Sequence, residues 1–288
     1  MVRLEFSTVL GYEVMAPGCD FIFSVQAAYT PRQLVTHESL GLSQPVATTS
    51  YTDPVTHNRL LRLHAEPGNL TLSYTAVVDL IHFEAQPASL AEASPLDLPG
   101  EVLPYLYPSR YCQSDRLLAL ADKEFGHLAP GYGRAQAICD WVQRHVSFLG
   151  NTSNSTTSAI DTLVERVGVC RDFAHLMIAL CRAASLPARM ASGMDYGADP
   201  ALGPPDFHAY VEVYLGDRWY LFDPSGTAIP MGFVRFATGR DAADIAFATI
   251  FGSVIPAQPQ IQINAVPNSL GQLELPQHVD YALSTDGP

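Results

Sequence analysis

The sequence predicts an α+β fold in which an N-terminal β-sandwich precedes a domain built from a central helix packed on an antiparallel sheet. Three observations support this prediction. Short alternating or β-branched runs fill residues 3–83, a helix that is apolar nearly all round covers residues 170–184, and the runs 207–215 and 218–223 form a strand pair. With 288 residues, 48% hydrophobic and 16% charged, the chain can bury the core of one large or two ordinary domains.

Residues 1–105 are predicted to be the β-sandwich domain. Strand-like runs such as 21–25, 60–64 and 70–78 are divided by clusters of Pro, Gly, Asn and Asp, which favour turns. The Pro- and Ala-rich stretch 86–104 is expected to be a linker that crosses to the next domain. A second domain is therefore expected to follow it.

That second domain is assigned to residues 106–266 and opens with helical signals. Ser114 can cap a helix with one apolar face, and a second helix shows the same spacing. The apolar positions of the two helices are Leu118, Ala121 and Phe125, then Ile138, Trp141, Val142 and His145. The Asn/Ser/Thr run 151–158 is predicted to be a loop, with lining of a cleft as its alternative role, and Ser158 is expected to cap a short helix ending near Arg166.

The helix that starts at Cys170 has no polar face, and Pro187 stops it, so we expect it to be buried at the centre of this domain. The later strand-like run 260–266 is expected to join the sheet that contains the strand pair 207–215 and 218–223. Residues 267–288 are expected to form an extended or partly disordered tail.

The strand pair can be given a register. Gly216-Asp217 fits a two-residue hairpin turn with Gly first, which would pair Leu215 with Arg218 and, further along, Tyr210 with Asp223. His208 and Asp223 then become diagonal neighbours on one face, about 7 to 8 Å apart at the backbone, within reach for a carboxylate and an imidazole. A three-residue loop would reverse this parity.

Cys170 lies where a turn becomes a helix, and this position favours a reactive thiol. In the first turn of a helix a thiolate faces unpaired backbone N–H groups and the positive end of the helix dipole. His208 and Asp223 follow it in the chain. The order Cys, His, Asp is that of a nucleophile, its base and the residue that orients the base. Cys170, His208 and Asp223 are therefore the candidate catalytic residues.

Three motifs carry a resemblance to a known family: residues 168–175 (GVCRDFAH), 207–214 (FHAYVEVY) and 219–224 (WYLFDP). Further similarity lies in 105–111 and 239–244. The chain resembles the transglutaminase-like superfamily of papain-like cysteine enzymes, and its bacterial branch most closely, from its start to about residue 265. The resemblance implies a papain-like fold for the second domain and places the family's Cys, His and Asp at the three candidate residues.

The resemblance also implies a reaction, acyl transfer through a thioester on Cys170 with a peptide or protein as substrate. Animal transglutaminases have Trp beside the cysteine where this chain has Arg171, so hydrolysis of a peptide or amide bond is expected instead of crosslinking. A catalytically silent peptide-binding or scaffolding module stays open as an alternative.

Other chemistries lack their motifs. There is no Cys-x-x-Cys, His-Glu-x-x-His, Gly-x-Ser-x-Gly, Walker or Gly-x-Gly-x-x-Gly pattern and no EF-hand loop, so no cofactor, structural zinc or calcium is expected. A metal held by Cys170, Cys181, His175 and His208 remains a minor alternative. On helical spacing, His175 is instead expected to be a buried, hydrogen-bonded histidine, and Cys139 and Cys181 to be core residues.

The net charge of −13 argues against nucleic acid or an anionic membrane as partner, because both need a basic face. The chain starts without the apolar run of a signal peptide and has no stretch of about 20 apolar residues. Five cysteines without framework spacing suit free thiols in a reducing cytoplasm. The oligomeric state stays open.

Overall fold

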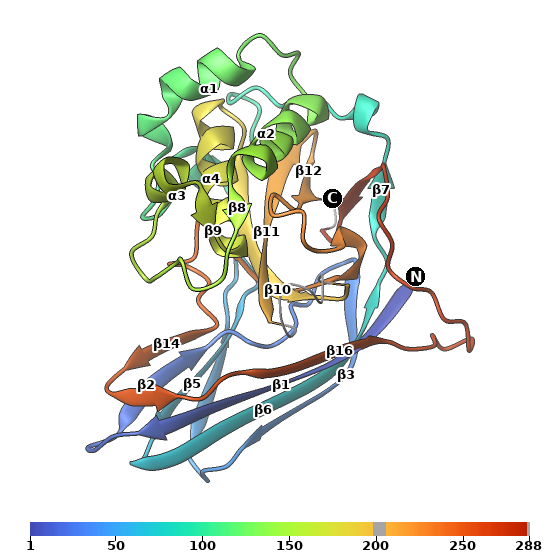
Figure 1. Ribbon diagram of the computed structural model, residues 1–288. Helices are drawn as coiled ribbons and strands as arrows, with labels where there is room; N and C mark the ends of the chain where they lie inside the picture. Colours follow the sequence, from blue (N-terminus) through green and yellow to red (C-terminus); the bar gives the residue numbers. More distant parts are fainter. Residues whose placement is uncertain (198–205, 287–288) are drawn as a thin grey trace.

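The computed structural model describes residues 1–197 and 206–286, and Figure 1 shows a strand-built layer below a domain covered by helices. The larger sheet of the lower layer is centred on two long antiparallel strands, β1 (Val2–Val14) and β6 (Gly68–Leu80), which pair along their whole length. Alternating residues of β1 are buried, as period-two burial of one sheet face requires. β3 (Gln33–Leu42) pairs with the other edge of β6.

The second sheet of the sandwich has the strand order β14-β2-β5-β4. Its strands are β2 (Cys19–Phe23), β4 (Thr48–Thr52), β5 (Arg59–Ala65) and β14 (Ala248–Phe251). Phe21 and Phe23 from this sheet pack with Tyr12 of the first, with ring centroids 5.1 and 6.0 Å apart. The predicted N-terminal β-sandwich is thereby confirmed.

The chain returns to the sandwich after the second domain. β14 pairs with β2, while β15 (Val254–Pro256) and β16 (Gln260–Ala265) pair with β1. The expectation that strand 260–266 joins the sheet of the second domain is wrong, because Ile261 and Ile263 pack on the apolar core of the sandwich. The division of the chain into domains at residues 1–105 and 106–266 remains a proposal. Strand pairing assigns residues 248–265 to the sandwich and not to the second domain.

The second domain has an antiparallel sheet of order β12-β11-β10-β13, as the predicted papain-like fold requires. Its strands are β10 (Ala188–Asp195), β11 (Phe207–Leu215), β12 (Arg218–Phe222) and β13 (Phe233–Gly239). On β11, Val211 and Val213 pack with the helices, whereas Tyr210 packs with the sandwich. The sheet is therefore buried on both faces, which makes it a rigid support for side chains.

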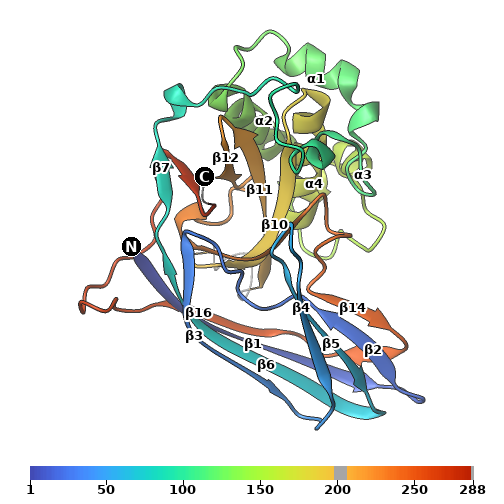
Figure 2. The same cartoon turned by 180° about the vertical axis from the view of Figure 1, so that it is seen from behind.

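Helices cover the outer face of this sheet (Figure 2). The α-helices are α1 (Leu118–Phe125), α2 (Tyr132–His145), α3 (Ala159–Glu165) and α4 (Cys170–Ala183). Short 3-10 turns are η1 (Pro87–Ser89), η2 (Leu103–Leu106), η3 (Ser114–Arg116) and η5 (Pro230–Gly232). The strands β8 (Ser147–Phe148) and β9 (Val167–Gly168) are two residues long and pair in parallel. Ser158 is the N-cap of α3 as predicted, and its N–H and hydroxyl both donate to Asp161 Oδ2, at 2.9 and 2.7 Å.

The linker between the domains is packed against the protein. Leu98, Val102 and Tyr105 form a small apolar cluster with Tyr214 and Trp219 of the hairpin. This crossing segment therefore lies on the back of the hairpin.

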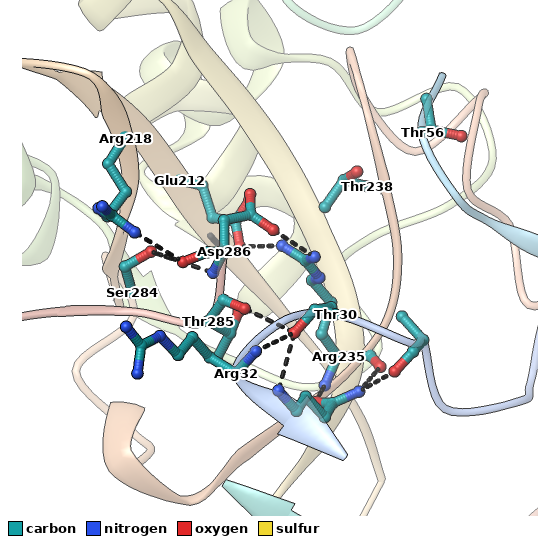
Figure 3. A network of polar contacts seen from close by, with 12 residues as sticks. Thr30, Arg32, Thr56, Glu212, Arg218, Arg235, Thr238, Ser284, Thr285 and Asp286 are labelled. Carbon is teal, nitrogen blue, oxygen red and sulfur yellow. Dashed lines mark hydrogen bonds and ion pairs between the residues drawn. The ribbon is translucent and has the colours of Figure 1, made fainter. Parts of the chain in front are cut away.

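The C-terminal segment is anchored, so the expectation of partial disorder is wrong for residues 282–286. β17 (Ala282–Ser284) pairs with β7 (Phe83–Ala85), and the Asp286 carboxylate forms ion pairs with Arg189 and Arg235. Figure 3 shows Asp286 together with Arg235 and Glu212. Both arginines also pair with Glu212 of β11, which is 1% exposed. Buried charges are paired in this way because an isolated one is costly to desolvate.

Candidate active site

The turn before α4 determines where Cys170 lies. Val169 is extended and α4 begins directly at Cys170, which is partly exposed. The Asp172 carboxylate accepts the Val169 N–H at 2.9 Å, which holds this turn closed. A Cβ on Gly168 would lie 2.7 Å from the Asp172 side chain, so the close approach requires glycine there. The thiol is thereby held at the N-terminus of a buried helix.

Two neighbours of the cysteine hold the preceding loop against the helix. Ser153 donates a hydrogen bond to the buried Asp172 carboxylate at 2.8 Å, and Arg171 donates to Ser153 and to the carbonyl of Asn154. Arg171 also lies 3.7 Å from the Asp172 carboxylate. Ser153 and Asn154 of the predicted loop therefore pack beside the first turn of α4, and the lining of a cleft by this loop stays a prediction.

The hairpin has the predicted register. Gly216 takes a positive φ of 63° in the two-residue turn, and Leu215 pairs with Arg218, Tyr214 with Trp219 and Val211 with Phe222. His208 near the start of β11 and Asp223 just after β12 consequently meet. Their side chains approach with 3.5 Å between His208 Nε2 and Asp223 Oδ1. Long contacts of this kind are common in active sites without substrate.

The His208 imidazole interacts with Cys170 as well as with Asp223. Burial on its own would lower the pKa of His208, but negative charge on Cys170 and the Asp223 carboxylate outweigh burial and raise it well above its ordinary value. The arrangement therefore favours the charged, imidazolium form of His208.

Asp223 is held by its own loop. Its Oδ1 accepts the N–H and hydroxyl of Ser225 at 3.0 and 2.6 Å, and its Oδ2 accepts the Ala228 N–H at 3.0 Å. Burial works to raise the pKa of Asp223, and its contacts with His208, Ser225 and Ala228 lower it below the ordinary value. The carboxylate thus stays ionised and fixed in orientation.

A β-bulge lies opposite His208. Gly193 of β10 pairs with His208 in the sheet, and the register between β10 and β13 shifts between Ser192 and Gly193. A Cβ on Gly193 would lie 1.9 Å from the carbonyl oxygen of Val234. Bulges of this kind redirect side chains near active sites. The strand that supports the histidine is therefore shaped by a position that only glycine can occupy.

The remaining cysteines and His175 are distant from this chemistry or serve the core. His175 is buried, stacks on Tyr111 and accepts the Ala242 N–H at 3.2 Å, and burial lowers its pKa to about 3. Cys139 and Cys181 are buried core residues, as predicted. Cys170 and Cys181 lie eleven residues apart on α4, so the structure does not bring the four residues of the metal alternative together, and no cluster of potential ligands occurs among the described residues.

Sequence reasoning missed Asp195 and Tyr210. Tyr210 shares the His208 face of β11, and their rings meet edge to face at 4.7 Å. The Tyr210 hydroxyl donates to Asp195 Oδ1 at 2.6 Å. Alternation along β11 could have indicated Tyr210, but only the pairing with β10 brings Asp195 beside it.

Comparisons with known proteins identify the family of the chain. Residues 119–224 match the family model of the transglutaminase-like superfamily, and residues 2–99 match that of the bacterial transglutaminase N-terminal domain. The crystal structure of a proposed cysteine protease from Cytophaga hutchinsonii is similar to this chain with a TM-score of 0.90 and 39% identity, covering 98% of this chain and 97% of that one.

More distant relatives are uncharacterized proteins of mycobacteria. The match to the Mycobacterium leprae protein has 25% identity over 194 residues, 64% of this chain and 68% of the relative. The match to the Mycobacterium tuberculosis protein has 26% identity over 171 residues, 55% of this chain, and spans 51% of the relative, about half its length.

Fold, site and relatives together define a cysteine-based enzyme. The chain belongs to the transglutaminase-like superfamily, with a bacterial transglutaminase N-terminal domain before the core. In the described ranges, 1–197 and 206–286, no helix is long and apolar enough to cross a membrane.

Proposed function

We propose that this protein hydrolyses a peptide or amide bond by acyl transfer through a thioester on Cys170. The observation that carries the proposal is the position of His208, which interacts with the Cys170 thiol and the Asp223 carboxylate at once. The solved relative described as a cysteine protease supports the same reaction class.

In the first half of the reaction, the Cys170 thiolate attacks the carbonyl carbon, and the carbonyl oxygen becomes an oxyanion. The backbone N–H of Cys170, in the first turn of α4, is the proposed donor to that oxygen, because N–H groups of a first turn have no partner within their own helix. The His208 imidazolium then gives its proton to the leaving amine as the C–N bond breaks, which leaves a thioester and a neutral imidazole.

In the second half, neutral His208 takes a proton from water as the water oxygen attacks the thioester. The C–S bond breaks, the thiolate returns and the acid product leaves. With Nε2 directed to Asp223, Nδ1 is the nitrogen available to the thiol and water. Asp223 holds this orientation and stabilises the imidazolium each time it forms.

Water is favoured over an amine as acceptor because of Arg171. The position next to the nucleophile carries a guanidinium bound to Ser153 and Asn154 instead of the indole of animal transglutaminases. A cation at this position opposes the approach of a protonated lysine side chain.

The test uses a peptide library incubated with the protein in ¹⁸O-water, with biotinylated cadaverine as a competing amine. We expect ¹⁸O in newly formed carboxyl ends with the wild type and none with Cys170→Ala. Incorporation of cadaverine in place of ¹⁸O would show a transferase, and no reaction with either acceptor would favour the silent peptide-binding module.

We also propose a cytoplasmic location. All five cysteines are free thiols, four of them buried, which suits a reducing compartment. Cell fractionation with a thiol-trapping reagent tests this, and recovery of the protein in a periplasmic fraction would contradict it.

A further inference from the structure

A second carboxylate lies behind the candidate histidine. Asp195 ends β10 and is 5% exposed. Gly193 pairs with His208 and Ala191 with Tyr210, so the alternation of β10 directs Asp195, two residues beyond Gly193, to the face that bears both rings. None of the steps above uses this carboxylate.

Asp195 connects to the site by two hydrogen bonds. Its Oδ1 accepts the Tyr210 hydroxyl at 2.6 Å, and the fully buried Tyr210 ring meets the His208 ring edge to face. Its Oδ2 accepts the Ile229 N–H at 3.3 Å, and the preceding N–H, that of Ala228, donates to Asp223. Two carboxylates thus hold consecutive N–H groups of one loop.

We propose that Asp195 is a positioning residue for the candidate reaction: through Tyr210 and the Ile229 N–H it fixes His208 and supplies negative charge that stabilises the imidazolium. This inference rests on the proposed function and deepens it. The charge matters most after the thioester forms, because Cys170 is then neutral and only carboxylates can stabilise the imidazolium that develops as water attacks.

The surroundings of Asp195 favour a group that changes charge near neutrality. Burial raises the pKa of Asp195 to about 7, opposed by Tyr210 and His208 and supported by Asp223. Its remaining strand partner, Phe233 of β13, is apolar.

A further carboxylate close in the chain to His208 provides a control. Asp206, just before β11, is exposed, and the partial burial of its carboxyl raises its pKa, while the Phe207 N–H and the charge of His208 work to lower it. Because solvent screens an exposed charge, removing Asp206 should affect the imidazole much less than removing the buried Asp195.

The experiment measures the His208 titration by NMR of ¹³C-labelled histidine in full-length Cys170→Ala protein, where no thiolate contributes. We expect Asp195→Asn to lower the pKa of His208 by about one unit and Tyr210→Phe by about half of that, because an opposite charge nearby shifts a pKa by one unit or more. Asp206→Asn should change it by less than about 0.3 unit. The His208 signal is assigned by its loss in His208→Ala.

The outcomes separate this inference from the proposed function. Equal His208 titrations in the Asp195→Asn, Tyr210→Phe and parent proteins overturn the positioning role, while ¹⁸O incorporation by the wild type leaves hydrolysis standing. An Asp206→Asn shift as large as that of Asp195→Asn also overturns it, because the effect would then be general charge removal. Wild-type protein without any thioester chemistry overturns both.

Discussion

Replacing Asp286 by Ala should destabilise the protein by about 3 kcal/mol, because it breaks a buried charge network. The network contains two cations, Arg189 and Arg235, and two anions, Glu212 and Asp286. Without the Asp286 carboxylate, Glu212 is the one anion of this network that remains beside Arg189 and Arg235, and Arg235 is only 6% exposed. Removing one partner of a buried pair costs about 3 to 5 kcal/mol, and the low end applies since Glu212 still pairs with both arginines and the Asp286 side chain is 20% exposed.

The assay is thermal unfolding followed by circular dichroism. About 2 °C per kcal/mol is expected for a chain of this size, so the Tm should fall by about 6 °C. Asp280→Ala is the matched control, since Asp280 lies on the same C-terminal segment and forms no ion pair within the described part of the chain. Equal Tm values for the two variants at pH 7 would refute the reasoning.

The pH dependence provides a second check. Burial works to raise the pKa of Asp286, but Arg235 and Arg189 outweigh it and hold that pKa well below its usual range. A carboxyl with a depressed folded pKa stabilises the protein above its unfolded pKa of about 3.9 and loses this contribution as the pH falls. The Tm difference between wild type and Asp286→Ala should therefore be constant from pH 7 to about 5 and shrink below about pH 4.

Three further predictions concern the site. Brief iodoacetamide treatment should label Cys170 and spare the other four cysteines, which are buried, as read by peptide mass mapping; preferential labelling of another cysteine would remove Cys170 as nucleophile. Asp223→Asn should lower the hydrolysis rate by about three to four orders of magnitude while slowing alkylation of Cys170 much less, because the imidazole loses its orientation. An equal decrease in the hydrolysis rate and the alkylation rate would contradict the role of Asp223 in orienting His208. Gly193→Ala should cost about 3 kcal/mol in urea unfolding, since its Cβ would collide with the Val234 carbonyl oxygen; wild-type stability would show that the bulge tolerates a side chain.

The hairpin and its residues could be predicted because their determinants are local. A two-residue turn fixes the register of the strands that it joins, so the meeting of His208 and Asp223 follows from Gly216 and the alternation of β11. The start of α4 is equally local, since Gly168 and Asp172 close the turn within five residues. Composition and motifs in these segments were therefore sufficient to predict where the candidate side chains lie.

Partners brought together by long-range pairing could not be predicted. Alternation marks β16 as a strand but does not say which sheet edge it joins, and packing of Ile261 on the sandwich core decides this. The C-terminal segment lacks periodicity, and its position depends on the Asp286 ion pairs with arginines about 50 and 100 residues earlier in the chain.

Asp195 depends on the same kind of long-range information, and this bears on how the site is built. The histidine strand β11 receives Asp223 from β12, to which a tight turn joins it, and Asp195 from β10, which precedes it in the chain and pairs with it in an unbroken register. Asp223 accepts the Ala228 N–H and Asp195 accepts the Ile229 N–H, so the loop that follows β12 is hydrogen-bonded to carboxylates from both sides of β11. In the proposed reaction this arrangement would help the imidazole to hold one geometry through two successive proton transfers.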